Sequence, residues 1–195
     1  MGGYAQEHIY YTMTQLMGKM PIDKIKVSDI VSAGHMNRKT FYYHFHGMDD
    51  LLKWMVAIQI DQLNLNDASP DNWKEKFSEL TSCIYANRAF FSDIFSSKYA
   101  PEIETYMIGK LSRHMMAFIN NCIAAVEKTR KKRIHIEQSN KEHIYSYYSR
   151  GVFSLVADWI RSDCKDSPEL FLEIVDHLTS NTIFNVIDAF SSENA

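Results

Sequence analysis

A short stretch near the N-terminus combines basic, hydroxyl and aromatic side chains whose chemistry suits DNA. Arg38 can form a bidentate pair with guanine, and Lys39 supplies a point charge for a base edge or a phosphate. The hydroxyl groups of Thr40 and Tyr42 can bind phosphate oxygens, and the ring of Tyr43 can lie against a thymine methyl group or a sugar. We therefore predict a DNA-binding surface that comprises Lys26, Asn37, Arg38, Lys39, Thr40, Tyr42, Tyr43 and His44.

Two very short helices must position these side chains. The first is predicted from Val27 to Ala33 and stops at Gly34, and the second is capped by Asn37 and continues through His44. Two such helices joined by a turn form a helix-turn-helix, whose second helix fits a major groove about 12 Å wide.

The second helix also carries large apolar residues, which are expected to anchor it from behind. Met36, Phe41 and Phe45 are spaced five and four residues apart, so they can face the protein while the polar side chains face outward. A simpler interpretation is a solvated helix face with Tyr42 and Tyr43 packed sideways. Composition alone leaves both interpretations open, because a single helix-turn-helix pattern has many false positives.

This stretch resembles the DNA-binding domain of the TetR/AcrR family of bacterial transcription regulators. The resemblance is close over about residues 5–55 and rests on residues 27–31, Gly34, residues 37–45 and residues 49–52, which read VSDIV, G, NRKTFYYHF and DDLL. Weaker similarity follows in residues 87–91, residues 147–151, Trp159 and residues 167–170. These segments resemble the C-terminal domain of the branch that includes regulators of dihydroxyacetone kinase operons.

The resemblance implies a homodimer, a ligand or partner site in the C-terminal helices, and a motion that changes the spacing of the two recognition helices. It also implies that Tyr42 meets the phosphate backbone and that DNA is contacted by Arg38, Lys39, Thr40, Tyr43 and His44. The sequence departs from the family at three positions. The family often has Gly at Lys39, Lys at Met48 and Thr at Lys26, so Lys26 and Lys39 are expected to bind phosphate in place of the lysine that Met48 replaces.

The rest of the chain predicts an all-α fold of about nine helices, because apolar residues recur every three or four positions and the 195 residues include only 7 Gly and 4 Pro. We predict a helix-turn-helix domain over 1–50, a connector helix over about 48–65 and a helical regulatory and dimerisation domain over 66–195. The loop at 66–70 marks the boundary. The remaining helices are expected at Tyr4–Met17, Asn72–Tyr85, Arg88–Ser96, from Pro101 through Cys122, Asn140–Ser162 and Pro168–Phe190, the last two antiparallel, with the basic run Lys128–Arg133 between helices.

The C-terminal helices supply candidate residues for self-association and for an effector. The last helix has an apolar band too broad for one contact face, which favours a dimer interface, although an internal core helix would show the same residues. Aromatic and methionine side chains can line a cavity for an aromatic or amphipathic molecule, although they can equally fill a core. The interface candidates are Phe171, Ile174, Leu178, Ile183, Phe184 and Ile187, and the pocket candidates are Tyr85, Phe91, Phe95, Tyr106, Met115 and Tyr148.

Composition and motifs exclude several other classes. No apolar run is long enough for a bilayer, and Cys83, Cys122 and Cys164 show no metal-ligand or disulfide spacing. No phosphate loop, metal cluster or activated nucleophile indicates an enzyme, so we predict no catalytic residue, metal or cofactor. The N-terminus lacks a secretory signal, so the expected location is the bacterial cytoplasm.

Net charge alone does not exclude DNA as a partner. The chain has 21 Lys+Arg and 24 Asp+Glu, a net charge of −3, but residues 1–55 carry 6 basic and 5 acidic residues. The acidic excess therefore belongs to the C-terminal part. We expect a sequence-specific regulator, in the first instance a repressor, that binds a pseudo-palindromic operator as a homodimer and responds to a small-molecule or protein signal. The alternative is a helical protein-interaction module or co-regulator in which DNA binding is vestigial.

Overall fold

The computed structural model describes residues 3–63, 65 and 67–193 and contains nine α-helices within them. The predicted all-α fold is therefore confirmed. A single 3-10 turn and one two-residue antiparallel pair, which the sequence pattern did not predict, are the other regular elements in this part of the chain. The helices are α1 Tyr4–Met17, α2 Val27–Ala33, α3 Arg38–His44, α4 Met48–Asp61, α5 Trp73–Ala86, α6 Arg88–Phe95, α7 Ala100–Arg130, α8 Gln138–Arg161 and α9 Pro168–Phe190, with η1 Ile22–Lys24, β1 Ile134–His135 and β2 Ser192–Glu193.

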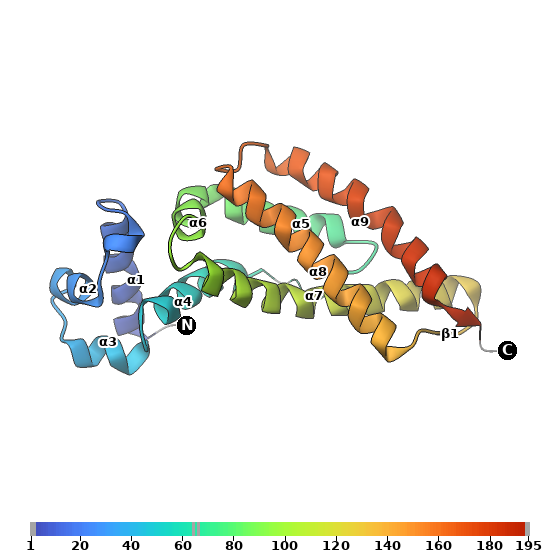
Figure 1. Ribbon diagram of the computed structural model, residues 1–195, viewed down its shortest axis with the longest axis horizontal. Coiled ribbons are helices and arrows are strands. Elements are labelled where there is room, and N and C mark those ends of the chain that lie inside the picture. The colour runs from blue at the N-terminus through green and yellow to red at the C-terminus, as the bar shows by residue number, and fades with distance from the viewer. Residues whose placement is uncertain (1–2, 64, 66, 194–195) are drawn as a thin grey trace.

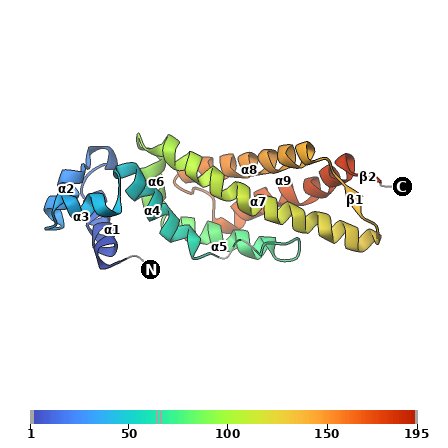
Figure 2. The same cartoon turned by 90° about the horizontal axis from the view of Figure 1, so that it is seen from below.

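The molecule is elongated, with the small helices at one end and the long helices along the rest of its length (Figure 1). Helices α1 to α3 form the helix-turn-helix end, and α4 leads from it into the body. Helix α7 runs along the length of the body, and α8 and α9 lie beside it (Figure 2). The recognition helix α3 and the β1–β2 pair thus occupy opposite ends of the molecule.

Local sequence signals explain most helix ends. Helix α1 begins where the main-chain N–H of Gly3 donates to Oε1 of Gln6 at 3.0 Å, and α9 begins where the Ser167 hydroxyl accepts from the N–H of Leu170 at 3.3 Å. Pro168 at the first position of α9 has no N–H to leave unpaired. The ends of α1, α2, α3 and α9 agree with their predicted positions.

Two predicted boundaries are wrong. Helix α7 continues through Arg130, so half of the basic run Lys128–Arg133 is helical rather than part of a connection. Lysine and arginine are good helix formers, and α7 ends only where Lys131 adopts a left-handed conformation with φ of 52°. Helix α4 ends at Asp61, earlier than the predicted 65. Residues 64 and 66, which fall in the predicted end of this helix and the predicted loop, lie outside the described residues.

The hydrophobic core has two parts. The larger part continues from Ile9 in α1 to Val175 in α9, so one apolar cluster joins the helix-turn-helix end to the body. The smaller part lies at the far end and includes Ile123, Ile144 and Ile187 from α7, α8 and α9.

The turn between the last two helices is fixed by an aromatic stack. The rings of Trp159 and Phe171 are 4.5 Å apart and nearly parallel, at 5°, and Nε1 of Trp159 donates to the Asp166 carbonyl at 3.0 Å. These contacts hold α8 and α9 side by side and antiparallel, as predicted (Figure 1). No helix among the described residues is long and apolar enough to cross a membrane.

Candidate nucleic-acid interface

The turn between α2 and α3 is held tightly against α1. Nε2 of His8 lies 2.8 Å from the Gly34 carbonyl oxygen, within hydrogen-bonding distance. A Cβ at Gly34 would lie 2.5 Å from Met36 Cε, at the flexible end of that side chain, and 3.0 Å from the Ile30 carbonyl oxygen, so a larger residue would crowd the turn. The left-handed residue of the turn is His35, with φ of 49°, rather than the glycine.

The recognition helix α3 starts with a side-chain cap. Oδ1 of Asn37 accepts a hydrogen bond from the N–H of Thr40 at 2.8 Å and another from its hydroxyl at 3.1 Å. The hydroxyl proton of Thr40 is thus used within the cap. Because phosphate oxygens only accept hydrogen bonds, Thr40 can donate to a phosphate only after it leaves Asn37.

Two buried phenylalanines fix the inner side of α3. Phe41 is fully buried and Phe45 is 2% exposed, so both pack in the core as predicted. On the outer side, Tyr43 is 84% and Tyr42 53% exposed. The rings of Tyr42 and Phe41 are nearly perpendicular, at 84°, with their centres 5.5 Å apart. Both tyrosine rings are therefore accessible to a partner, and a solvated helix face would show the same exposure.

Three cations near this helix are available for an anionic partner. Lys26, Arg38 and Lys39 are exposed, and no ion pair joins any of them to another residue that the structure describes. The acidic groups that follow α3 are already engaged. Asp50 accepts hydrogen bonds from the N–H of His46 at 3.0 Å and from its ring at 3.1 Å, and the first of these is the main cause of the lowered pKa of Asp50.

The start of α4 lacks a cation, as its sequence indicated. Met48 is buried, with 8% of its surface exposed, so it can offer no contact to a phosphate. His44 is half-buried at the end of α3, with its ring 4.9 Å from that of Tyr43 and perpendicular to it. The exposed cations and tyrosines, with the half-buried Thr40 and His44, are the predicted DNA contacts, which we call the recognition surface (Lys26, Asn37, Arg38, Lys39, Thr40, Tyr42, Tyr43, His44).

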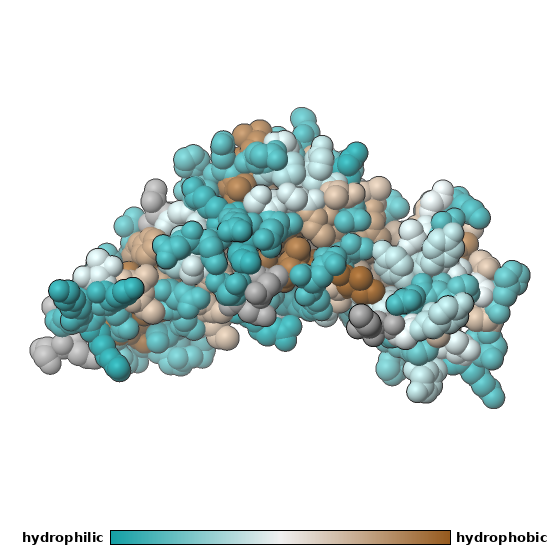
Figure 3. Space-filling model, turned by 180° about the vertical axis from the view of Figure 1, so that it is seen from behind, coloured by the Kyte–Doolittle hydropathy of each residue, from teal (hydrophilic) through white to brown (hydrophobic). Residues whose placement is uncertain are grey.

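The predicted interface residues divide into two groups. Phe171, Ile183 and Ile187 are at most 4% exposed and pack within the chain's own core, so their assignment to a subunit interface is corrected. Ile174 and Leu178 are 39% and 54% exposed. Phe184 is half-buried. On the face seen in Figure 3, hydrophobic patches lie over the helical body, whereas the helix-turn-helix end is mostly hydrophilic or intermediate.

The predicted pocket residues also divide. Tyr106 and Met115 line two small cavities in the body. The other four candidates belong elsewhere. Phe91 and Phe95 fill the core, Tyr148 is buried with its hydroxyl 3.1 Å from that of Thr182, and Tyr85 is partly exposed beside Trp159. Aromatic periodicity did not separate cavity walls from core, because several helices contribute to each cavity.

His114 is a cavity residue that was not predicted from the sequence. It lines both cavities from α7, and its Nδ1 is buried without a hydrogen-bond partner among the described residues. The available signal was helical spacing, because His114 follows Leu111 by three residues and precedes Phe118 by four, on the apolar side of the predicted helix. No group of three or more potential metal ligands occurs in the described part of the chain.

Solved structures of other proteins share this all-α fold. A solved structure of the dihydroxyacetone kinase operon activator DhaS matches 97% of this chain and 99% of its own, with a TM-score of 0.65 and 22% identity. The fatty acid degradation regulator FadR from Bacillus halodurans matches 92% of this chain and 96% of its own, with a TM-score of 0.60 and 14% identity. At these identities the likeness shows the fold.

Sequence comparison gives the family. Residues 71–181 match the TetR family described as "Transcriptional regulator C-terminal region". The chain belongs to this family of TetR-type transcriptional regulators, whose members are not enzymes. The HTH-type dhaKLM operon transcriptional activator DhaS of Lactococcus lactis is 27% identical over 90 residues. That alignment covers 46% of this chain and only 48% of the relative.

Proposed function

We propose that this regulator binds a specific, pseudo-palindromic DNA operator as a homodimer and acts in the bacterial cytoplasm, where the chromosome lies. The observation that carries the proposal is the recognition surface, in which exposed cations and tyrosines project from a helix that buried phenylalanines fix from behind. A helix of this size fits the major groove.

Each side chain has a role that follows from its chemistry. Arg38 in the first turn of α3 pairs with guanine, and Lys39 and Lys26 bind phosphates or a base edge. Tyr43 lies against a thymine methyl group or a sugar, whereas Tyr42 and His44 meet the backbone. Asn37 caps the first turn of the helix. The Thr40 hydroxyl, which donates to Asn37 Oδ1, donates to a phosphate oxygen instead when DNA binds.

We place the dimer interface on exposed faces of α8 and α9. Leu170, Ile174 and Leu178 recur every four residues along α9 and are 47%, 39% and 54% exposed. Gly151 and Ser154 are exposed on α8, where small residues allow a partner helix to approach closely. A dimer would place two recognition helices about 34–36 Å apart, one DNA turn, so two half-sites are read together.

The domain organisation and the control of the regulator complete its proposed function. We propose a DNA-binding domain over residues 1–50, a connector over about 48–65 and a regulatory and dimerisation domain over 66–195 that receives a small-molecule or protein signal. We also propose that the protein represses its target. The relative from Lactococcus lactis is named an activator, and fusion of the target promoter to a reporter distinguishes the two signs of control.

Fluorescence anisotropy with labelled duplexes tests the function. The full-length protein should bind DNA from upstream of its own gene more tightly than random duplex, and Arg38→Ala should weaken this binding by about 1–3 kcal/mol. Arg133→Ala, an exposed arginine at the opposite end of the molecule, is the control and should bind as the wild type does. Equal affinity for both duplexes, with Arg38→Ala silent, would contradict the proposal and favour a protein-interaction module.

A further inference from the structure

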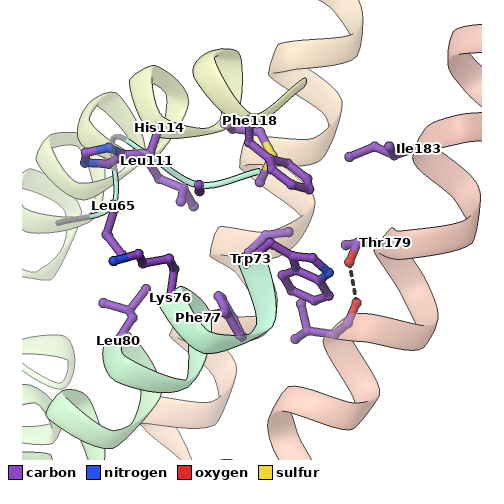
Figure 4. Close-up of a pocket in the computed structure, with 14 residues that line it drawn as sticks. Leu65, Trp73, Lys76, Phe77, Leu80, Leu111, His114, Phe118, Thr179 and Ile183 are labelled. Carbon is purple, nitrogen blue, oxygen red and sulfur yellow. Dashed lines mark hydrogen bonds between the residues drawn. The ribbon is translucent and has the colours of Figure 1, made fainter. Parts of the chain in front are cut away.

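Two adjoining cavities lie inside the helical body. Their volumes are about 80 and 40 Å³, and their walls come from α4, α5, α7, α8 and α9. Figure 4 shows the larger cavity, with Leu111 and His114 on α7 and with Trp73 and Phe77 on α5; the ring of His114 lies on the side of Leu65. The two cavities form one divided site, because they share the walls Leu65, Phe77, Leu80, Leu111, His114 and Val152.

His114 differs from other polar residues in these walls. Lys76 lies 3.5 Å from Asp67, Lys110 pairs with Asp61, and Thr179 donates to the Val175 carbonyl at 2.7 Å. Nδ1 of His114 is buried and has no partner among the described residues. An unpaired buried nitrogen is costly to a folded protein, so a group that completes this hydrogen bond would be bound favourably.

The surroundings of His114 define the charge of that group. Burial lowers the pKa of its imidazole, and the nearby charges of Arg113 and Lys110 lower it further, so the ring is neutral at neutral pH. A neutral ring donates from one nitrogen and accepts at the other. A hydroxyl group both donates and accepts, and therefore pairs with Nδ1 in either tautomer.

The walls and size of the site define the rest of the ligand. Trp73, Phe77 and Phe118 line the larger cavity, which favours an aromatic body. Its volume of about 80 Å³ is below the roughly 150 Å³ of a protein cavity that accepts benzene. Even with the adjoining 40 Å³, a single aromatic ring therefore fits only if the walls move apart, and the flexible side chain of Met115 in the wall can make that room.

A groove on the surface adjoins the site. An open groove of about 350 Å³ between α5, α7 and α9 shares Trp73, Phe118 and Ile183 with the larger cavity. These three side chains separate the groove from the cavity, so their movement would admit a ligand.

We propose that His114 is the polar anchor of a binding site for a small, uncharged aromatic compound that carries a hydroxyl group, with phenol as the simplest example. The aromatic ring occupies the cavities, and the hydroxyl pairs with Nδ1 of the imidazole. As a site for the regulatory signal this assignment rests on the proposed function, whereas binding itself does not require DNA.

Isothermal titration of the full-length protein tests the assignment with phenol, toluene and benzoate. Phenol should bind about fivefold more tightly than toluene, which has the same ring without the hydroxyl, because one hydrogen bond is gained. Benzoate should bind more weakly than phenol. His114→Leu should abolish the preference for phenol, and His114→Gln, which keeps a polar group, should retain part of it. His143→Leu, at an exposed histidine of α8, should behave as the wild type does.

Three outcomes would overturn the assignment. In the first, phenol and toluene bind equally or neither binds. In the second, folded His114→Leu still prefers phenol. In the third, benzoate binds more tightly than phenol. A circular dichroism spectrum establishes that each variant is folded. Failure to bind an operator would overturn the proposed function and leave the phenol result intact, so the two failures are distinguishable.

Discussion

The main-chain N–H of Lys98 donates a hydrogen bond of 2.9 Å to the carboxylate of Asp23, and the Lys98 ammonium group donates to the Asp23 carbonyl at 3.1 Å. Asp23 lies in η1 at the helix-turn-helix end, and Lys98 lies between α6 and α7 in the body. These bonds therefore tie the helix-turn-helix end to the body beside α4.

Asp23→Ala removes the acceptor for the Lys98 N–H and should lower the free energy of unfolding by about 1 kcal/mol. Urea unfolding followed by circular dichroism measures the change. Asp71→Ala, at an exposed aspartate in the loop before α5, is the control and should change stability by less than about 0.5 kcal/mol. Equal effects of the two substitutions would show that the bonds at Asp23 contribute nothing specific.

Gly34→Ala should destabilise the protein and weaken DNA binding. The new Cβ would lie 2.5 Å from Met36 Cε, so this side chain must move, and 3.0 Å from the main-chain carbonyl of Ile30, which must shift by a few tenths of an ångström. We expect a loss of about 1–3 kcal/mol in unfolding free energy. The same change at Gly109 in α7 meets nothing within 4 Å and should stabilise the helix by about 0.5–1 kcal/mol. Thermal unfolding of both variants measures these opposite shifts, and a neutral Gly34→Ala would refute the close-packing explanation.

Local signals made much of the fold predictable from sequence. Gly34 marks the end of α2, and Asn37 and Pro168 mark the starts of α3 and α9. Each of these signals depends only on residues nearby in the sequence. The end of α7 was missed because Lys131, a non-glycine residue, takes the left-handed position.

Sites assembled from several helices were less predictable. The residues of the recognition surface lie within one helix and its approach, so spacing along the chain is enough to group them in a prediction. The cavities draw their walls from five helices, and whether Phe91 or Tyr106 reaches them depends on packing that spacing along the chain does not determine. The burial of Phe171 likewise depends on its stack with Trp159.

Two of the three cysteines should resist thiol reagents in the folded protein. Burial raises the pKa of Cys122 to about 12 and that of Cys164 to about 11, so neither forms thiolate at pH 8. Labelling with a chromogenic disulfide, followed by mass spectrometry, should modify both only after urea is added. Rapid labelling of Cys122 in folded protein would contradict its burial.

The burial of Cys122 also predicts that the free energy of unfolding depends on pH. The folded state holds the thiol proton more tightly than the unfolded state, whose thiol has the ordinary pKa of 9.0. The stabilisation is therefore fully present below pH 9 and is lost as the pH rises from 9 toward 12. Urea unfolding at pH 8 and pH 10 should show a smaller decrease for Cys122→Ala than for the wild type. An identical decrease would contradict the assignment.

Ile174→Glu should convert the proposed dimer to a monomer. A carboxylate in the middle of the exposed α9 stripe would be buried without a partner on association. Ile58→Glu is the matched control, because Ile58 has the same 39% exposure but lies on α4. Sedimentation velocity should give a dimer for the wild type and Ile58→Glu. If Ile174→Glu sediments as the wild type does, the interface lies elsewhere.

Selection of bound duplexes from a random DNA pool tests the central claim most directly. The full-length protein should enrich a pseudo-palindrome whose half-sites are centred about 10 base pairs, or a multiple of one helical turn, apart. Arg38→Ala and Tyr43→Ala should each lose base preference within the half-sites. The assignment of the recognition surface would be contradicted if the folded wild-type protein enriches no sequence. It would also be contradicted if both variants enrich the same sequence as the wild type.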